Sequence, residues 1–365
     1  MKTTALLLLA PLGAAMKVKV FILAGQSNME GHGVATKSRG ANDGNGTVQW
    51  EVEHGDWKKL PVCPTMAEQT AEVGCRAEHA DFDGLMTDGN WTVFDDAFVH
   101  FEGSRNKTGP LSVGFGISDD FVGPEYGFGV SLQGAFDDQT KVLLLKWAWG
   151  GTALQTDWRP PSSGGVLGWC YGNMTEVVHR VLDTGLSSVV PGYDYGADSY
   201  DIAGFAWHQG WNDGCGDEGT KEYEANLRNL IHDVRAEFGV ENLPVSIGLS
   251  GFGGWGQGVD RRLEIMRAQY NVSTYVANVA TVETRGFFRD FTETGGCINQ
   301  GYHWFGNGET YVYVGTAMGA AMKALLAGTW VQPKIDYLPP AGGAVSCASA
   351  FACGPYADGE PLCYW

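Results

Sequence analysis

The sequence predicts an α/β fold, a three-layer α/β/α sandwich around a five-stranded parallel sheet of the flavodoxin-like type. Apolar runs of strand length alternate along the chain with segments of helical periodicity, which is typical of βαβ units. The chain has 365 residues, enough for one α/β domain with long insertions. Aromatic residues make up 12% of it, whereas disordered chains are poor in aromatics. The sequence therefore predicts a packed core.

Five apolar runs are expected to form the strands. They are 18–24, 141–147, 201–207, 244–249 and 276–282. The clearest helix is 221–238, where Leu227, Leu230, Ile231 and Val234 fall at positions i, i+3, i+4 and i+7. Further helices are expected at 126–136, 174–182, 261–270 and 309–326.

Two segments lie outside this alternation. Residues 31–120 are rich in Gly, Asp and Asn without periodicity, and loops of this length are usually functional or internally stapled. Residues 331–365 contain Pro, Gly and three of the cysteines, which predicts a disulfide-held tail. The main domain is therefore expected at 16–330, with 31–120 as an insertion.

The first fifteen residues have the layout of a secretory signal peptide. Lys2 precedes the apolar run 5–12, and small residues stand at the −3 and −1 positions of a cut after Ala15. The alternative is that Met16 is itself a start. Eight cysteines and five N-x-S/T sequons, at Asn45, Asn90, Asn106, Asn173 and Asn271, agree with export. We expect a secreted, disulfide-bonded glycoprotein.

Charge and motif content exclude several classes of function. The net charge is −18, and an acidic surface repels nucleic acid and anionic lipid headgroups. Apart from the N-terminal run, which is too short, no stretch approaches the ~18 apolar residues of a membrane span. The acidic segment 81–90 lacks the EF-hand spacing, and no zinc or phosphate-binding motif is present. We expect a solvated loop there and no metal or cofactor, with calcium binding by this segment as the alternative.

The most informative segment directly follows the first predicted strand. Its residues are Gly25-Gln26-Ser27-Asn28-Met29. Open α/β sheets bind ligands at the carboxyl ends of their strands, so Ser27 is placed to act as a nucleophile where backbone N–H groups can stabilise an oxyanion. The alternative is a serine that caps a helix. The segment is not a G-x-S-x-G elbow, because Met29 takes the place of the second glycine.

These residues resemble the first block of the SGNH-type hydrolases, in the carbohydrate esterase and sialate O-acetylesterase branch. Residues 123–125 (Gly-Pro-Glu) resemble the second block, and residues 207–213 (Trp-His-Gln-Gly-Trp-Asn-Asp) the third. His303, just before the last predicted helix, occupies the place of the catalytic base. The resemblance spans 17–327, with its blocks in the family's order.

The resemblance implies a metal-independent serine esterase acting on acetylated sugars or polysaccharides. Ser27 would attack the ester and His303 would take its proton. The oxyanion and substrate would be held by Gln26, the Ser27 N–H, an N–H of the 123–127 segment that includes Gly127, and the amide of Gln209 or Asn212. The alternatives are a core or capping role for His303 and an Asx turn at Asn212. The acidic charge favours neutral over polyanionic glycans.

The sequence departs from the family at the carboxylate that usually supports the base. Gln300 stands where many relatives have Asp, and Trp211 where some have Glu. The remaining candidates for a third catalytic member are Asp213, Asp290 and Glu283. If none of them supports His303, the enzyme works as a Ser–His dyad. The remaining alternative is that the protein has lost catalytic activity and binds glycans on the same scaffold.

Tryptophans near the motifs are candidates for stacking on sugar rings. Trp147 and Trp207 lie on predicted strands and are expected in the core. Trp211 and Trp304 flank motif residues. We expect these two to contact sugar.

Overall fold

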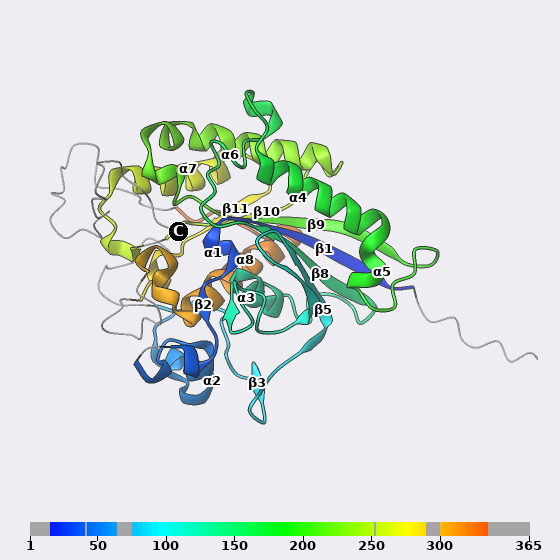
Figure 1. The fold of residues 1–365 in the computed structure, drawn as a ribbon, viewed down its shortest axis with the longest axis vertical. Helices are drawn as coiled ribbons and strands as arrows, with labels where there is room; N and C mark the ends of the chain where they lie inside the picture. The colour runs from blue at the N-terminus through cyan, green and yellow to red at the C-terminus, as the bar shows by residue number, and fades with distance from the viewer. Residues whose placement is uncertain (1–14, 41, 64–74, 252, 290–299, 335–365) are drawn as a thin grey trace, which may run out of the picture.

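The computed structural model describes residues 15–40, 42–63, 75–251, 253–289 and 300–334. The predicted signal peptide and most of the predicted tail lie outside these residues, as does Asp290. A central sheet runs through the molecule with helices on both faces (Figure 1). The predicted α/β sandwich is confirmed.

The central sheet has seven strands in the order β11-β10-β9-β1-β8-β5-β6. All neighbouring pairs are parallel except β5 and β6, so β6 is an antiparallel edge. The strands are β1 (Lys17–Gly25), β5 (Phe94–Glu102), β6 (Asn106–Leu111), β8 (Thr140–Ala148), β9 (Ser199–His208), β10 (Val245–Gly248) and β11 (Val279–Val282). All five predicted strands are present.

The prediction of only five strands was wrong, because the 31–120 insertion contributes β5 and β6. In β5, Ala97, Val99 and Phe101 are fully buried. Two aspartates precede this apolar stretch and His100 interrupts it, which hid the strand in the sequence. The pairing of β5 with β6 also shifts register between Phe94 and Phe98. Such an irregularity breaks the period-two pattern by which strands are recognised.

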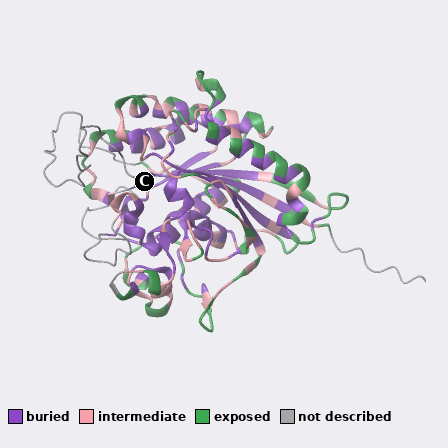
Figure 2. Ribbon diagram, viewed as in Figure 1, coloured by how far each residue is buried: buried purple, intermediate pink, exposed green. Residues whose placement is uncertain are grey.

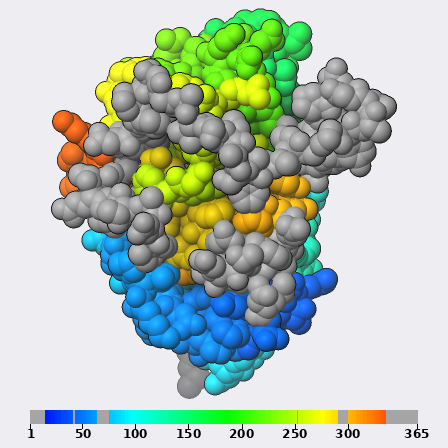
Figure 3. Space-filling view, turned by 90° about the vertical axis from the view of Figure 1, so that its left-hand side faces the viewer, coloured from blue at the N-terminus to red at the C-terminus, as the bar shows by residue number. Residues whose placement is uncertain are grey.

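Short elements organise the rest of the insertion. The strands β2 (Gly33–Val34) and β7 (Phe121–Val122) pair at its two ends, and β3 (Met86–Thr87) pairs with β4 (Asn90–Trp91). A disulfide joins Cys63 to Cys75. Figure 3, which views the molecule from the left-hand side of Figure 1, shows the blue residues of the insertion at one end and the green and yellow residues of the later segments at the other.

Helices cover the two faces of the sheet. On one face lie α4, α6 and α7, and on the other α3 and α8 (Figure 1). Figure 2 shows buried strands, helices α4, α6 and α7 with exposed outer surfaces, and helices α3 and α8 that are almost wholly buried. The helices are α1 (Ser27–Glu30), α2 (Val48–His54), α3 (Pro124–Ser131), α4 (Trp169–Arg180), α5 (Leu186–Val189), α6 (Asp217–Glu237), α7 (Asp260–Tyr275) and α8 (Gly308–Leu326).

Glycines let α3 and α8 approach each other closely. A Cβ on Gly127 would lie 2.1 Å from the Val312 carbonyl oxygen, and a Cβ on Gly315 would lie 2.0 Å from that of Pro124. Any side chain at these positions would force the helices apart. This contact anchors α8 against α3, and with it the turn Gly301–Gly306 that precedes α8. No helix of the described chain is long and apolar enough to cross a membrane.

Candidate active site

A pocket of about 220 Å³ opens where β1, β8 and β9 end. Four of the predicted site residues line it: Gln26, Ser27, Asn212 and His303. They come from three separate loops, which parallel strands bring to the same edge of the sheet. The other lining residues are Glu30, His32, Gly150, Gly151, Trp211 and Tyr302.

Ser27 is the first residue of α1, directly after the turn that ends β1. The turn requires glycine at position 25, because a Cβ there would lie 2.1 Å from the His208 carbonyl oxygen on β9. The N–H groups of Met29 and Glu30 donate to the Gln26 carbonyl, which fixes the helical turn. In the described part of the chain the Ser27 Oγ has no hydrogen-bond partner. Catalytic hydrogen bonds are often formed only once substrate binds.

A ring of amide contacts ties the three loops together. The Gln26 Oε1 accepts from the Gly210 N–H at 3.1 Å, and the Gln26 Nε2 donates to the Asn212 Oδ1 at 3.1 Å. The Asn212 Nδ2 in turn donates to the Gly151 carbonyl at 2.7 Å. These bonds fix the orientation of the Asn212 amide, because its oxygen and nitrogen have distinct partners. One Nδ2 hydrogen remains for a ligand.

His303 lies in the turn Gly301–Gly306 that precedes α8. Its Nδ1 lies 2.7 Å from the Gln300 Oε1. Because that oxygen only accepts, Nδ1 carries the hydrogen and the lone pair is on Nε2. Burial, with a smaller contribution from His32, lowers the pKa of His303 to about 2. The ring is therefore neutral in the resting protein, with the lone pair on Nε2.

The backbone around His303 is held in an unusual conformation. Trp304 and Phe305 both have positive φ, at 48° and 53°. Such residues cost roughly 1 kcal/mol each and persist only where the surroundings impose them. Asn28 supplies part of this constraint, since its Nδ2 donates to the Tyr302 carbonyl at 3.0 Å and its Oδ1 accepts from the Tyr311 hydroxyl at 2.7 Å. Asn28 thus joins the Ser27 helix to the His303 loop.

Glu30 and His32 form the side of the pocket next to His303. The His32 and His303 rings stack with centroids 3.6 Å apart, and the Glu30 Oε2 lies 3.8 Å from the His32 Nε2. Burial alone would raise the pKa of Glu30, but the nearby His32, Ser104 hydroxyl and Gly150 N–H outweigh burial and lower it. The pocket therefore contains an ionised carboxylate.

Sequence reasoning missed Glu30, His32, Gly150, Gly151 and Tyr302. The glycine pair directly follows a predicted strand, so its place at the carboxyl edge could have been noticed. Gly151 has a φ of 68°, and its N–H makes no hydrogen bond within the described residues. Nothing in the sequence indicated that His32 would stack on His303.

Two predicted oxyanion donors lie away from the pocket. Gly127 faces α8, as described above. The Gln209 Nε2 donates to the Thr152 carbonyl at 3.0 Å and to the Asp213 Oδ2 at 2.7 Å. Gly127 and Gln209 therefore make structural contacts. The glycines that line the pocket are Gly150 and Gly151, from the loop after β8.

Asp213, one candidate for the third catalytic member, braces a loop. Its carboxylate accepts from the N–H groups of Leu154 and Gln155 at 2.8 and 2.9 Å, as well as from Gln209. Burial raises the pKa of Asp213 to about 6 against the opposing effect of these donors, so the group is ionised at neutral pH. It shares no contact with His303, whose Nδ1 faces Gln300.

Replacing Asp213 with Asn is expected to destabilise the protein by about 3 kcal/mol at pH 7.5. An amide nitrogen would face one of the two backbone N–H donors, which leaves a buried donor unpaired. Urea unfolding measures the change. Asp194→Asn is the control, because its exposed carboxylate also accepts from a backbone N–H, that of Gly196 at 2.8 Å. Equal effects of the two substitutions would contradict the bracing role.

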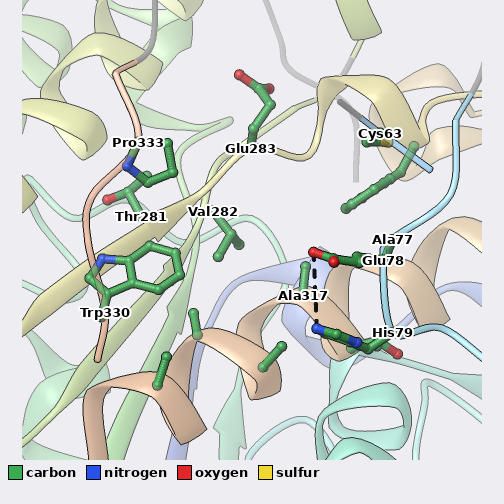
Figure 4. Close-up of a pocket in the computed structure, with 15 residues that line it drawn as sticks. Cys63, Ala77, Glu78, His79, Thr281, Val282, Glu283, Ala317, Trp330 and Pro333 are labelled. Carbon is green, nitrogen blue, oxygen red and sulfur yellow. Dashed lines mark ion pairs between the residues drawn. The ribbon is translucent and has the colours of Figure 1, made fainter. Parts of the chain in front are cut away.

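Glu283 belongs to a different cavity. It pairs with Arg285 at 2.7 Å and lines a pocket of about 300 Å³ beside Trp330 and the alanines of α8 (Figure 4). That pocket contains none of the residues around Ser27. Glu283 therefore does not support His303, and Asp290 lies outside the described residues.

The predicted sugar-stacking role of Trp304 was wrong. Its ring is fully buried and packs against His208 and Tyr311, with centroids 5.3 and 5.0 Å away. Trp211 does line the pocket, with the Arg262 guanidinium 3.8 Å from its ring centroid on one face. Trp147 and Trp207 are buried, as predicted.

The described residues contain no group of three or more His, Cys, Asp or Glu side chains arranged to hold a metal ion. Cys215 is disulfide-bonded in addition to Cys63 and Cys75. Cys170 is a buried free thiol.

The sheet and its helices, with a serine and a histidine at the carboxyl edge, have the architecture of the SGNH-type esterases. Residues 17–294 match the model of one family, described as carbohydrate esterase, sialic acid-specific acetylesterase. The chain belongs to this family.

The comparison with solved structures found distant likenesses. A protein from Arabidopsis thaliana is similar over 86% of this chain and 99% of its own, with 17% identity and a TM-score of 0.52. A carbohydrate acetylesterase from Xanthomonas citri is similar over 85% of this chain and 57% of its own, with 13% identity and a TM-score of 0.49. At such identities the likeness concerns the fold. No curated protein sequence matches the chain significantly.

Proposed function

We propose that the protein is a secreted serine esterase that hydrolyses O-acetyl esters on sugars or polysaccharides, with Ser27 as nucleophile and His303 as base. One observation carries the proposal. Ser27 and His303, from opposite ends of the domain, line the same small pocket with a fixed amide and a glycine turn. Membership of a carbohydrate esterase family supports the substrate class.

Acylation uses the lone pair on the His303 Nε2. The Ser27 Oγ attacks the acetyl carbonyl carbon while its proton passes to Nε2. When the tetrahedral intermediate collapses, the carbon–oxygen bond to the sugar breaks and His303 returns the proton to the sugar oxygen. The products of this half-reaction are the free sugar hydroxyl and an acetyl-Ser27 ester.

Three donors at the pocket wall suit the oxyanion. They are the N–H of Ser27, the N–H of Gly151 and the second hydrogen of the Asn212 Nδ2. The bond from Asn212 to the Gly151 carbonyl holds two of these donors in a fixed relation. Each such donor is typically worth about 3 kcal/mol in the transition state.

Deacylation repeats the chemistry with water. A water molecule gives its proton to the His303 Nε2 and attacks the acetyl carbon. The carbon–oxygen bond to Ser27 then breaks, the proton moves from His303 to the Ser27 Oγ, and acetic acid leaves and ionises in water. Gln300 keeps the hydrogen on Nδ1 throughout, so Nε2 remains the basic atom.

The size and surroundings of the pocket favour a small acyl group on a sugar. Its volume of about 220 Å³ lies below the range of pockets that enclose drug-sized ligands. The rings of Trp211 and Tyr302, with centroids 5.5 Å apart, stand at its wall and offer faces for a pyranose ring. The disulfides support export, because they persist in oxidising compartments.

A glycan-binding protein without turnover is the second candidate. The observation that favours it is Gln300, a neutral amide where the base usually has a carboxylate. Loss of that charge can cost up to about 10⁴ in kcat where the imidazole tautomer is wrong. Here the amide oxygen still selects the correct tautomer, which favours the enzyme.

A fluorophosphonate probe separates the two candidates. An activated serine forms a covalent adduct with it, and we expect mass spectrometry of the wild-type protein to place the adduct on Ser27. The Ser27→Ala protein should stay unlabelled, while Ser188→Ala, which changes an exposed serine of α5, should label normally. Absence of labelling in a protein that binds acetylated glycan would favour the binding protein.

A further inference from the structure

His303 must carry a positive charge during the proposed reaction, although it is buried. Gln300 accepts its Nδ1 hydrogen but has no charge to offer. Among the described residues that line the pocket, Glu30 is the one carboxylate. The His32 Nε2 lies near the Glu30 Oε2, and the His32 ring stacks on the ring of His303. Glu30 can therefore act on His303 through His32.

We infer that Glu30 and His32 form a positioning pair that takes over the role of the missing carboxylate: His32 holds the His303 ring by stacking, and Glu30 supplies the compensating negative charge. This inference rests on the proposed esterase function. Glu30 takes up no proton in the reaction. The proton of Ser27 goes to the His303 Nε2 and from there to the leaving oxygen.

The pair is rigid enough for this role. The Glu30 carboxylate lies beside the Gly150 N–H and the Ser104 hydroxyl, which help to lower its pKa, and a Cβ on Gly150 would lie 2.9 Å from the Glu30 Oε2. The His32 and His303 planes are inclined by 22°, so the stack restricts tilting of the base. The T-shaped contact of Tyr302, at 4.5 Å, restricts it from another side.

Two basic groups lie near the Glu30 carboxylate: His32, whose Nε2 is 3.8 Å from the Glu30 Oε2 and whose ring stacks on His303, and Lys146. The Lys146 ammonium donates to the Glu30 carbonyl, but it is paired with the Glu125 carboxylate at 2.6 Å. The remaining polar neighbours are neutral: Tyr302, Tyr311 and Gln300. A buried anion near a developing cation acts more strongly than it would in water, because the effective dielectric constant is lower.

The test begins with Glu30→Gln, which keeps the shape of the side chain and an oxygen for the Gly150 N–H. We expect kcat on 4-nitrophenyl acetate to fall about thirtyfold with KM nearly unchanged, since the lost interaction is made with the charged base of the transition state. The matched control is Glu309→Gln, which changes a carboxylate paired with Arg289 away from the pocket. This control should retain kcat within about twofold. A change of less than twofold in the folded Glu30→Gln protein would overturn the inference.

Rescue by a carboxylate at the usual position separates a charge effect from a structural one. Gln300→Asp places an anion beside Nδ1, and it should recover most of the kcat lost in the Glu30→Gln protein. In the Gln300→Asp background, Glu30→Gln should also shift the acidic limb of the kcat/KM profile to lower pH, because removing an anion makes His303 a weaker base. A double variant as slow as Glu30→Gln alone, with an unmoved acidic limb, would overturn the inference.

A second variant guards against misfolding at position 30. His32→Phe keeps a ring that can stack on His303 but removes the Nε2 atom that faces the Glu30 carboxylate. We expect a loss in kcat similar to that of Glu30→Gln. The two substitutions together should cost little more than either alone. Failure of the esterase proposal looks different, because Ser27→Ala would then retain activity. If Ser27→Ala is inactive while Glu30→Gln and His32→Phe are unaffected, only the inference on the pair is wrong.

Discussion

Ser27→Ala is expected to lower kcat on 4-nitrophenyl acetate by at least about 10⁴-fold. The substitution removes the proposed nucleophile while leaving the proposed oxyanion donors and the hydrogen bond between Gln26 and Asn212 in place. In serine hydrolases the loss of the nucleophile or base leaves a residual rate that comes from binding and oxyanion stabilisation alone. Steady-state kinetics with purified protein measures the loss.

A double variant makes this prediction sharper. If Ser27 and His303 act as one unit, Ser27→Ala with His303→Ala should be no slower than Ser27→Ala alone, because groups that act together are strongly non-additive. Multiplicative losses would mean that the two residues contribute independently, which contradicts the proposed proton transfer. Ser188→Ala should keep the wild-type rate, since its hydroxyl contacts only the Gly185 carbonyl.

The sequence was sufficient for the parts of the fold that rest on local pattern. The five core strands are near-continuous apolar runs, and Ser27 follows the first of them directly, so its place at the carboxyl edge could be deduced. The strand β5 could not, because its polar residues interrupt the apolar pattern and its ladder shifts register. Its pairing with β8 is a long-range contact that no local signal specifies.

The candidate site also contains residues that local sequence pattern predicts and residues that only tertiary contacts bring together. That Ser27 and His303 lie at one pocket could be predicted, because each lies next to a recognisable element. Gln300 was noticed as a departure from the family's carboxylate, whereas nothing in the sequence indicated that His32 would stack on His303 or that Glu30 would lie beside His32. Gly127 and Gln209 were assigned to the oxyanion although helix packing and a buried amide contact occupy them. Side-chain direction at the end of a strand depends on the loops around it, and the sequence does not specify those loops.

Lys146→Met is expected to destabilise the protein by about 3–5 kcal/mol, the largest stability effect of those considered. Lys146 and Glu125 are fully buried, and the Lys146 Nζ donates to Glu125 and, at 2.7 Å each, to the carbonyls of Glu30 and Phe115. Burial lowers the pKa of Lys146 and raises that of Glu125. Removing one member of such a pair leaves an uncompensated charge in the interior. Urea unfolding at pH 7.5 measures the loss.

The pH dependence of the variant distinguishes this cause from lost packing. Without Lys146, the folded state holds a proton on Glu125 that the unfolded state has released above the ordinary glutamate pKa of about 4.3. The folded state then binds more protons, so the stability of Lys146→Met should fall as the pH rises above that value. The control is Lys19→Met, which removes an exposed partner of Asp201 at 2.9 Å and should cost less than about 1 kcal/mol with no such slope. If Lys146→Met lost stability equally at pH 5 and pH 8, the loss would come from packing and not from the unpaired carboxyl group.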